Sequence, residues 1–204
     1  MFTIRTFAAA AAACLATALA GPAFAGDEHE HHHHHAEVAP GYDRQVVEYR
    51  VPTTTLLRSD GAKAQFPQAL DDGRPVLLNF IYTTCTAICP ILSHNFAEFQ
   101  RALGAESEGV HMVSITIDPE EDTPKRLSEY ARRFEAGKQW NFYTGTLASS
   151  VSLQKAFQVY FGDKMHHRPV TFLRAAPGEP WVRLDGFTSP ENLVAEYHRV
   201  VHGH

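Results

Sequence analysis

Two cysteines, Cys85 and Cys89, stand four residues apart after an apolar segment and just before Pro90. Thiols at this spacing can bind a soft metal ion as thiolates, or exchange electrons with a disulfide. If Cys89 lies in the first turn of a helix, its side chain comes onto the face of Cys85, because helical residues four apart are neighbours. The positive end of that helix would favour the thiolate form. The pair therefore permits metal binding and redox chemistry alike.

The residues before the pair predict a buried strand. Residues 76–82 are apolar and β-prone apart from Asn79, as expected for a strand covered on both faces of a parallel sheet. Chemistry in open α/β sheets gathers beyond the carboxyl ends of the strands, and Pro90 suits the first turn of a following helix. We therefore expect both sulfurs at a strand-to-helix junction.

The remaining pattern predicts alternating strands and helices. Three strand and helix pairs are followed by two strands and a last helix, which predicts an α/β, thioredoxin-like fold with a helical insertion. An N-terminal β-hairpin extension is predicted to turn at Asp60-Gly61. After the central strand we expect a helix at 92–103, a strand at 110–117, a helix at 127–134, a strand at 140–143, a helix burying Leu153, Phe157 and Tyr160, strands at 170–173 and 181–184, and a helix at 190–200.

An acidic segment, residues 118–122, follows the second core strand. Its simplest interpretation is structural, because Thr123 suits a helix N-cap, Pro124 suits the first helical position, and carboxylates stabilise the amino end of a helix. A second interpretation is that these carboxylates tune or bind a metal ion. His94, beside the apolar stripe of the preceding helix, is expected on the surface.

The N-terminus predicts export. Residues 1–25 have the pattern of a signal peptide, with Arg5 before an Ala-rich apolar stretch and Ala23-Phe24-Ala25 as cleavage site; an uncleaved anchor is the alternative. Cys14 would leave with the signal, so one thiol pair would enter an oxidising compartment, which we expect to be the periplasm. After cleavage we expect no stable membrane insertion.

Residues 26–42 predict a disordered tail ahead of a single domain at 43–204. Six histidines between His29 and His35 suit a metal-collecting role, while a plain linker or an artificial tag are the alternatives. The formal net charge is -5, and no basic patch stands out. The composition therefore argues against a nucleic-acid partner.

A late loop, His166-His167-Arg168-Pro169, precedes the strand predicted at 170–173. Thioredoxin-like folds place a cis-proline in this loop, which faces the active dithiol. We therefore expect an imidazole of this loop near the cysteines. Two thiolates and an imidazole suit Cu(I), a further ligand would complete a Cu(II) site, and the same donors would also suit zinc.

Three motifs together resemble the Sco (SenC) family of copper proteins: FIYTTCTAICP at 80–90, TIDPEEDTP at 116–124, and the late histidine. The resemblance spans about residue 53 to the C-terminus. It implies a thioredoxin-like fold, copper as cargo, and Cys85, Cys89 and His167 as its ligands. The family usually has an acid before this histidine, so His166 is a possible rival ligand.

The resemblance implies a periplasmic copper metallochaperone for the binuclear copper centre of cytochrome c oxidase. Its expected partner is the copper-accepting oxidase subunit or another periplasmic copper protein, and it would stay membrane-anchored if the signal is not cleaved. The alternative is a thiol-disulfide oxidoreductase with redox-active Cys85 and Cys89. Against it, the usual redox motif has two residues between its cysteines, and His167 would have no use. An inert disulfide and a zinc site are further alternatives.

Overall fold

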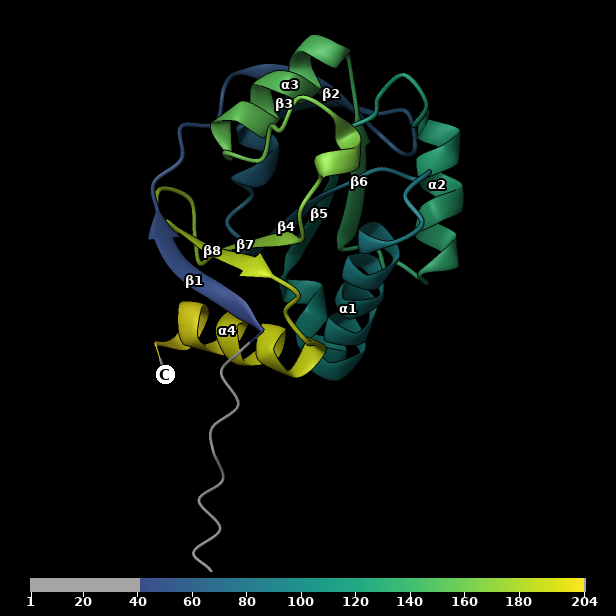
Figure 1. The fold of residues 1–204 in the computed structure, drawn as a ribbon. Helices are drawn as coiled ribbons and strands as arrows, with labels where there is room; N and C mark the ends of the chain where they lie inside the picture. Colours follow the sequence, from purple (N-terminus) through teal and green to yellow (C-terminus); the bar gives the residue numbers. More distant parts are fainter. Residues whose placement is uncertain (1–40, 204) are drawn as a thin grey trace, which may run out of the picture. The chain divides into compact units, whose positions relative to one another are not determined.

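Strand β4 (Val76–Ile81) is central, and all six of its residues are buried. The computed structural model describes residues 41–203, so the predicted signal and residues 26–40 of the predicted tail lie outside the described part. Within it, eight strands form one sheet in the order β1-β8-β7-β4-β5-β6-β2-β3 (Figure 1). The other strands are β1 (Tyr42–Val47), β2 (Thr54–Arg58), β3 (Lys63–Phe66), β5 (His111–Thr116), β6 (Trp140–Thr144), β7 (Val170–Arg174) and β8 (Trp181–Gly186).

Four α-helices and three 3-10 turns connect the described strands. Strands β4, β5 and β6 run parallel, whereas β7 pairs antiparallel with β4 and β8. The helices and turns are η1 (Gln68–Leu70), α1 (Ile88–Leu103), η2 (Gly104–Gly109), α2 (Pro124–Arg133), α3 (Leu147–Ala156), η3 (Lys164–His166) and α4 (Pro190–His202). This order confirms the predicted alternation, and the segment inserted between β5 and β7 contains α2, β6 and α3. None of these helices, in residues 41–203, is long and apolar enough to cross a bilayer.

The predicted helix after Pro90 is α1, and its predicted stripe is buried. Leu92, Phe96, Phe99 and Leu103 all lie in the core, and the helix ends at Gly104 as expected. The positive φ of 54° at Gly104 explains this end, because a glycine adopts that conformation without steric cost.

The N-terminal extension covers both edges of the sheet. The predicted hairpin is β2 and β3, which pair antiparallel and join the core through β6. Strand β1 instead pairs with β8 at the opposite edge. A hairpin turn can be recognised locally, but which core strand an extra strand joins depends on long-range pairing.

Two expectations about the fold were wrong. Tyr160 was predicted to face the core from a helix, yet α3 ends at Ala156 and Tyr160 is 41% exposed. Gln158 has a φ of 56°, which turns the chain out of the helical direction before Tyr160. In addition, the cis peptide bond among the described residues precedes Pro67, not Pro169.

Aromatic rings fill the core beneath the carboxyl end of β4. Phe80, Phe157 and Phe172 meet one another at centroid distances of 5.1 to 6.1 Å. All three are 0 or 1% exposed. Tilted and edge-on ring pairs of this kind stabilise a core beyond the area they bury. The strand that leads to the cysteines is therefore held rigidly.

Candidate metal centre

The two cysteines lie at the junction of β4 and α1, as the sequence predicted. Cys89 is the second residue of α1, and its N–H donates a hydrogen bond to the Cys85 Sγ at 3.4 Å. The N–H of Tyr82, just after β4, donates to the Cys89 Sγ at 3.5 Å. Both sulfurs are thiols in this structure. The amide of Cys89 thus contacts the sulfur of Cys85, although Cys85 lies before the helix and not in it.

The environments of the two thiols differ. Cys89 is 0% exposed, and burial raises its pKa well above the ordinary range because a thiolate there would lose its hydration. Cys85 is only partly buried. Burial raises the pKa of Cys85 too, but hydrogen bonds from the backbone N–H groups of Cys89 and Ala87 outweigh it, so the net shift is downward. Cys85 is therefore the thiol that ionises first.

His167 reaches the same strand end from the loop before β7. Its ring is 6% exposed, and its Nε2 lies 3.0 Å from the carbonyl oxygen of Phe80. Because a carbonyl only accepts, Nε2 carries the proton and donates, which leaves the Nδ1 lone pair available. Nδ1 is buried without a hydrogen-bond partner in the described part of the chain. Burial also lowers the pKa of His167 more than the Phe80 carbonyl raises it, so the ring is held neutral, the form that binds metal.

The three predicted ligands surround one strand end but are not a closed ligand set. Cys89 and His167 both bond to the backbone of the segment from Phe80 to Tyr82, and the rings of Tyr82 and His167 meet edge-on at 6.2 Å. The donor atoms of Cys85, Cys89 and His167 do not all lie within 4.8 Å of one another. Among residues 41–203, a different set of side chains meets this criterion. Binding of one ion by all three needs a movement of Cys85 or of the histidine loop.

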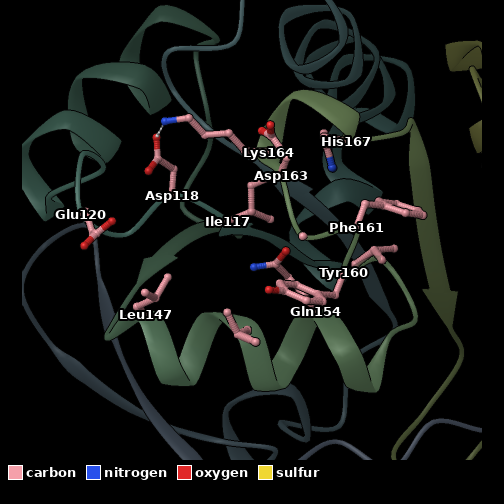
Figure 2. A pocket seen from close by; sticks show the side chains of 13 residues that line it. Ile117, Asp118, Glu120, Leu147, Gln154, Tyr160, Phe161, Asp163, Lys164 and His167 are labelled. Carbon is pink, nitrogen blue, oxygen red and sulfur yellow. Dashed lines mark hydrogen bonds and ion pairs between the residues drawn. The ribbon is translucent and has the colours of Figure 1, made fainter.

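The acidic segment after β5 anchors both loops. Asp122 is 0% exposed, and its carboxylate accepts from the Thr83 N–H at 3.1 Å, from the Thr116 hydroxyl at 2.5 Å and from the Thr83 hydroxyl. Asp118 pairs with Lys164 at 2.6 Å, in the turn just before His167 (Figure 2). One carboxylate therefore holds the cysteine loop and another holds the histidine loop.

This positioning role was missed from the sequence. Thr123 does cap α2, accepting from the Arg126 N–H, with Pro124 at the start of the helix, so the capping interpretation is confirmed. That interpretation did not separate the capping residue from the buried acids before it. The sequence signal that could have revealed this role was the acidic segment after β5, the strand that pairs with β4.

Two neighbours of His167 differ from it in exposure. His166, the predicted rival ligand, is exposed, whereas His167 is buried. Met165 is 72% exposed, and its Sδ lies 3.9 Å from the Tyr82 hydroxyl. Met165 was not singled out from the sequence, although a thioether beside a candidate copper ligand is itself a soft donor.

A cleft opens on one side of His167. It has a volume of ≈ 530 Å³, and its wall is formed by the end of β5, by α3 and by the loop that leads to His167 (Figure 2). The exposed rings of Tyr160 and Phe161 lie along it. Neither cysteine lines this cleft. The histidine is thus reached from the cleft, and Cys85 from its own partly exposed side.

A family model decides the relationship of this chain to known proteins. The SCO1/SenC model matches residues 55–202. The chain belongs to the SCO1/SenC family. The sequence resemblance is therefore confirmed for almost the whole described domain.

Two relatives illustrate the sequence similarity. The chain is 31% identical to the SCO1 protein homolog of Bacillus subtilis over 106 residues, which cover 52% of this chain and 54% of the relative. It is 34% identical over 90 residues to a putative copper-binding protein of Stutzerimonas stutzeri, covering 44% of this chain and 43% of that protein. The chain thus spans about half the length of these relatives.

Solved structures share the fold. ScoI of Bradyrhizobium japonicum with copper bound has a TM-score of 0.62 at 24% identity, over 73% of this chain and 98% of that chain. A SCO1/SenC family lipoprotein of Bacillus anthracis has a TM-score of 0.66 at 23% identity, over 76% of this chain and 97% of that chain. BsSco, described with a disulfide switch and as a member of the Sco family of cytochrome c oxidase assembly proteins, has a TM-score of 0.65 at 24% identity, over 78% and 96%. The predicted α/β, thioredoxin-like fold is confirmed.

Proposed function

We propose that this SCO1/SenC protein binds copper through Cys85, Cys89 and His167 and delivers it during assembly of cytochrome c oxidase. The observation that carries the proposal is the Nδ1 of His167, which has no hydrogen-bond partner among residues 41–203 and is buried at the strand end that also carries both thiols. An orphaned buried nitrogen is costly unless something binds it. Two sulfurs and one imidazole form a soft donor set that suits Cu(I). The copper-bound relatives support copper as the ion.

Loading moves a proton and closes the ligand set. Cys89 is protonated at neutral pH because burial raises its pKa, so it loses a proton when copper binds. Cys85 is partly exposed and can rotate toward the ion, while His167 already offers its lone pair. Affinity therefore rises with pH across the neutral range. Oxidation of the pair to a disulfide removes both thiolates and blocks loading.

Delivery would proceed by ligand exchange with the donor groups of an acceptor. We propose the copper-accepting subunit of the oxidase, or another periplasmic copper protein, as that acceptor. The chain would act in the periplasm, anchored to the membrane if the predicted signal is not cleaved. The histidines of residues 29–35 would collect copper at low affinity and raise its local concentration.

The contrast between the thiols also supports a second candidate function, thiol-disulfide exchange. Cys85 as thiolate would attack a substrate disulfide and form a mixed disulfide, releasing one substrate thiolate. Cys89 would then lose its proton and attack the Cys85 Sγ, so that the substrate leaves fully reduced and this chain is left with a disulfide. A dithiol reductant would have to restore the pair. The observation that favours this role is the partly exposed, more acidic Cys85 beside the buried Cys89.

Competition with a Cu(I) chelator tests the copper proposal on the reduced full chain. Cys85→Ser, Cys89→Ser and His167→Ala should each weaken Cu(I) binding by more than the about 10–100-fold that loss of an outer contact typically costs. His166→Ala is the matched control, since His166 is adjacent and exposed, and should change affinity by less than about twofold. Replacing the six tail histidines should reduce stoichiometry but not the tightest binding.

Two outcomes would overturn the assignment. One is His167→Ala behaving like His166→Ala; the other is loss of tight binding when only the tail histidines are replaced. Zinc binding tighter than copper would favour the zinc interpretation. Turnover of a disulfide substrate that survives in His167→Ala and stops in Cys85→Ser would favour the oxidoreductase.

A further inference from the structure

A second group of metal-ligand side chains lies away from the cysteines. Glu106 belongs to η2, and His198 and His202 belong to α4. One donor atom of each lies within 4.8 Å of the others. The two histidines are four residues apart, so they share one face of the helix, and their ring centroids are 5.6 Å apart.

The distances in this group also suit the spacing between two ligands of one metal ion. His198 Nε2 lies 3.6 Å from one oxygen of Glu106, and His202 Nε2 lies 3.5 Å from the other. The contact between His202 and Glu106 is a long hydrogen bond, since nitrogen–oxygen bonds are usually about 2.7–3.2 Å long. Two ligands each about 2.0–2.1 Å from a tetrahedral ion are separated by about 3.3–3.4 Å. Small side-chain rotations would therefore bring all three donors onto one ion.

A buried tyrosine of α4 lies beside the histidines of this group. Tyr197 of α4 is 3% exposed, and its ring packs edge-on against that of Phe99 of α1, with the ring centroids 5.7 Å apart. Its ring also lies 5.4 Å from that of His198. The Glu106 carboxylate contacts both histidines, one through each oxygen. The two histidines are thus carried by α4, a helix that packs against α1.

This group is separate from the cysteine site. Helices α1 and α4 lie side by side (Figure 1). Cys89 is in the first turn of α1, and Glu106 follows its last residue, Leu103. A helix of 16 residues is about 24 Å long. The two sites therefore lie at opposite ends of α1 and share no ligand.

We propose that Glu106, His198 and His202 form a binding site for a divalent transition metal ion, Cu²⁺ or Zn²⁺. Two imidazoles and a carboxylate are borderline to hard donors, which prefer these ions over Cu(I). Three protein ligands leave a coordination position open to water or to a donor from another molecule. The side chains are 39 to 46% exposed, so the ion can enter and leave directly.

The test removes both thiols of the proposed copper site and the histidines of the tail. The parent is the full chain with Cys85→Ala, Cys89→Ala and His→Asn at the six tail histidines; Cys85→Ser with Cys89→Ser provides a second background. Zn²⁺ titration against a chromogenic chelator should show one site in this parent. His198→Asn, His202→Asn and Glu106→Gln should each weaken it by at least about tenfold. Because the cysteines are absent, failure here would say nothing about the proposed copper delivery.

His94→Asn is the matched control. His94 Nε2 lies 3.7 Å from Glu98 on the exposed face of α1. This is a similar pair without a second imidazole, so loss of His94 should change Zn²⁺ affinity by less than about twofold. Electron paramagnetic resonance of bound Cu²⁺ should show two coupled nitrogens in the parent and one in His198→Asn. Absence of a stoichiometric Zn²⁺ site in the parent, or equal weakening by His94→Asn, would overturn the proposal.

Discussion

Replacing Asp122 with asparagine is the sharpest test of how the site is held. The carboxylate is 0% exposed and accepts from the Thr83 N–H and from the hydroxyls of Thr83 and Thr116. Asparagine has the same shape but only one acceptor oxygen, and its NH₂ group would face a donor N–H. Asp122→Asn therefore weakens the link between the end of β5 and the cysteine loop without making a cavity.

The expected loss follows from the bonds involved. A hydrogen bond to a charged group contributes about 1.5–3 kcal/mol. Burial raises the pKa of Asp122 more than its hydrogen bonds lower it, so the ionised carboxylate carries a desolvation cost that asparagine lacks. The net loss should therefore lie near the lower end, about 1.5–2 kcal/mol. For a domain of this size that lowers the thermal midpoint by about 3–8 °C.

Urea unfolding followed by tryptophan fluorescence measures this loss. The midpoint should fall in Asp122→Asn while the slope stays unchanged, because the surface exposed on unfolding is the same. Cu(I) affinity should fall as well, since Thr83 is at the start of the loop that carries Cys85.

Asp118→Asn is the control from the same segment. Its partner Lys164 is 41% exposed, so the pair should contribute no more than about 1 kcal/mol. An unchanged midpoint in Asp122→Asn, or an equal loss in Asp118→Asn, would refute the view that the buried carboxylate anchors the cysteine loop.

Two further predictions concern the thiols and the sheet edge. Alkylation of the reduced chain should modify Cys85 first, while Cys89 stays protonated and unreactive. The pH at which the alkylation rate of Cys85 is half-maximal should lie below that of an ordinary thiol, because its lowered pKa gives more thiolate at lower pH. Equal rates at both, read by peptide mass spectrometry, would contradict the assigned pKa directions. Glu196→Ala should lower the free energy of unfolding by about 1.5–3 kcal/mol, since the carboxylate is 1% exposed and accepts from Tyr42 at 2.9 Å and Arg44 at 2.8 Å. Amide exchange should then speed up in β1; equal protection there would show that Glu196 does not hold this edge.

The sequence by itself determined the elements whose signals are local. The apolar run predicted β4, the spacing of Leu92, Phe96 and Phe99 predicted α1, and Thr123 with Pro124 predicted the start of α2. Such patterns depend on sterics and hydrogen bonds within a few residues, so they can be recognised without knowing the contacts between distant parts of the chain. The placement of both cysteines at a strand-to-helix junction followed from the same signals.

Only the tertiary structure decided the contacts between distant residues. It placed β1 beside β8, exposed Tyr160, and left the Nδ1 of His167 unpartnered at the end of β4. It also brought Glu106 to the histidines of α4, more than ninety residues along the chain. No short-range period encodes such pairs, because they depend on how strands and helices pack in three dimensions. The pKa difference between the two thiols likewise arises from the deeper burial of Cys89 and the backbone hydrogen bonds to Cys85, and both belong to the folded chain.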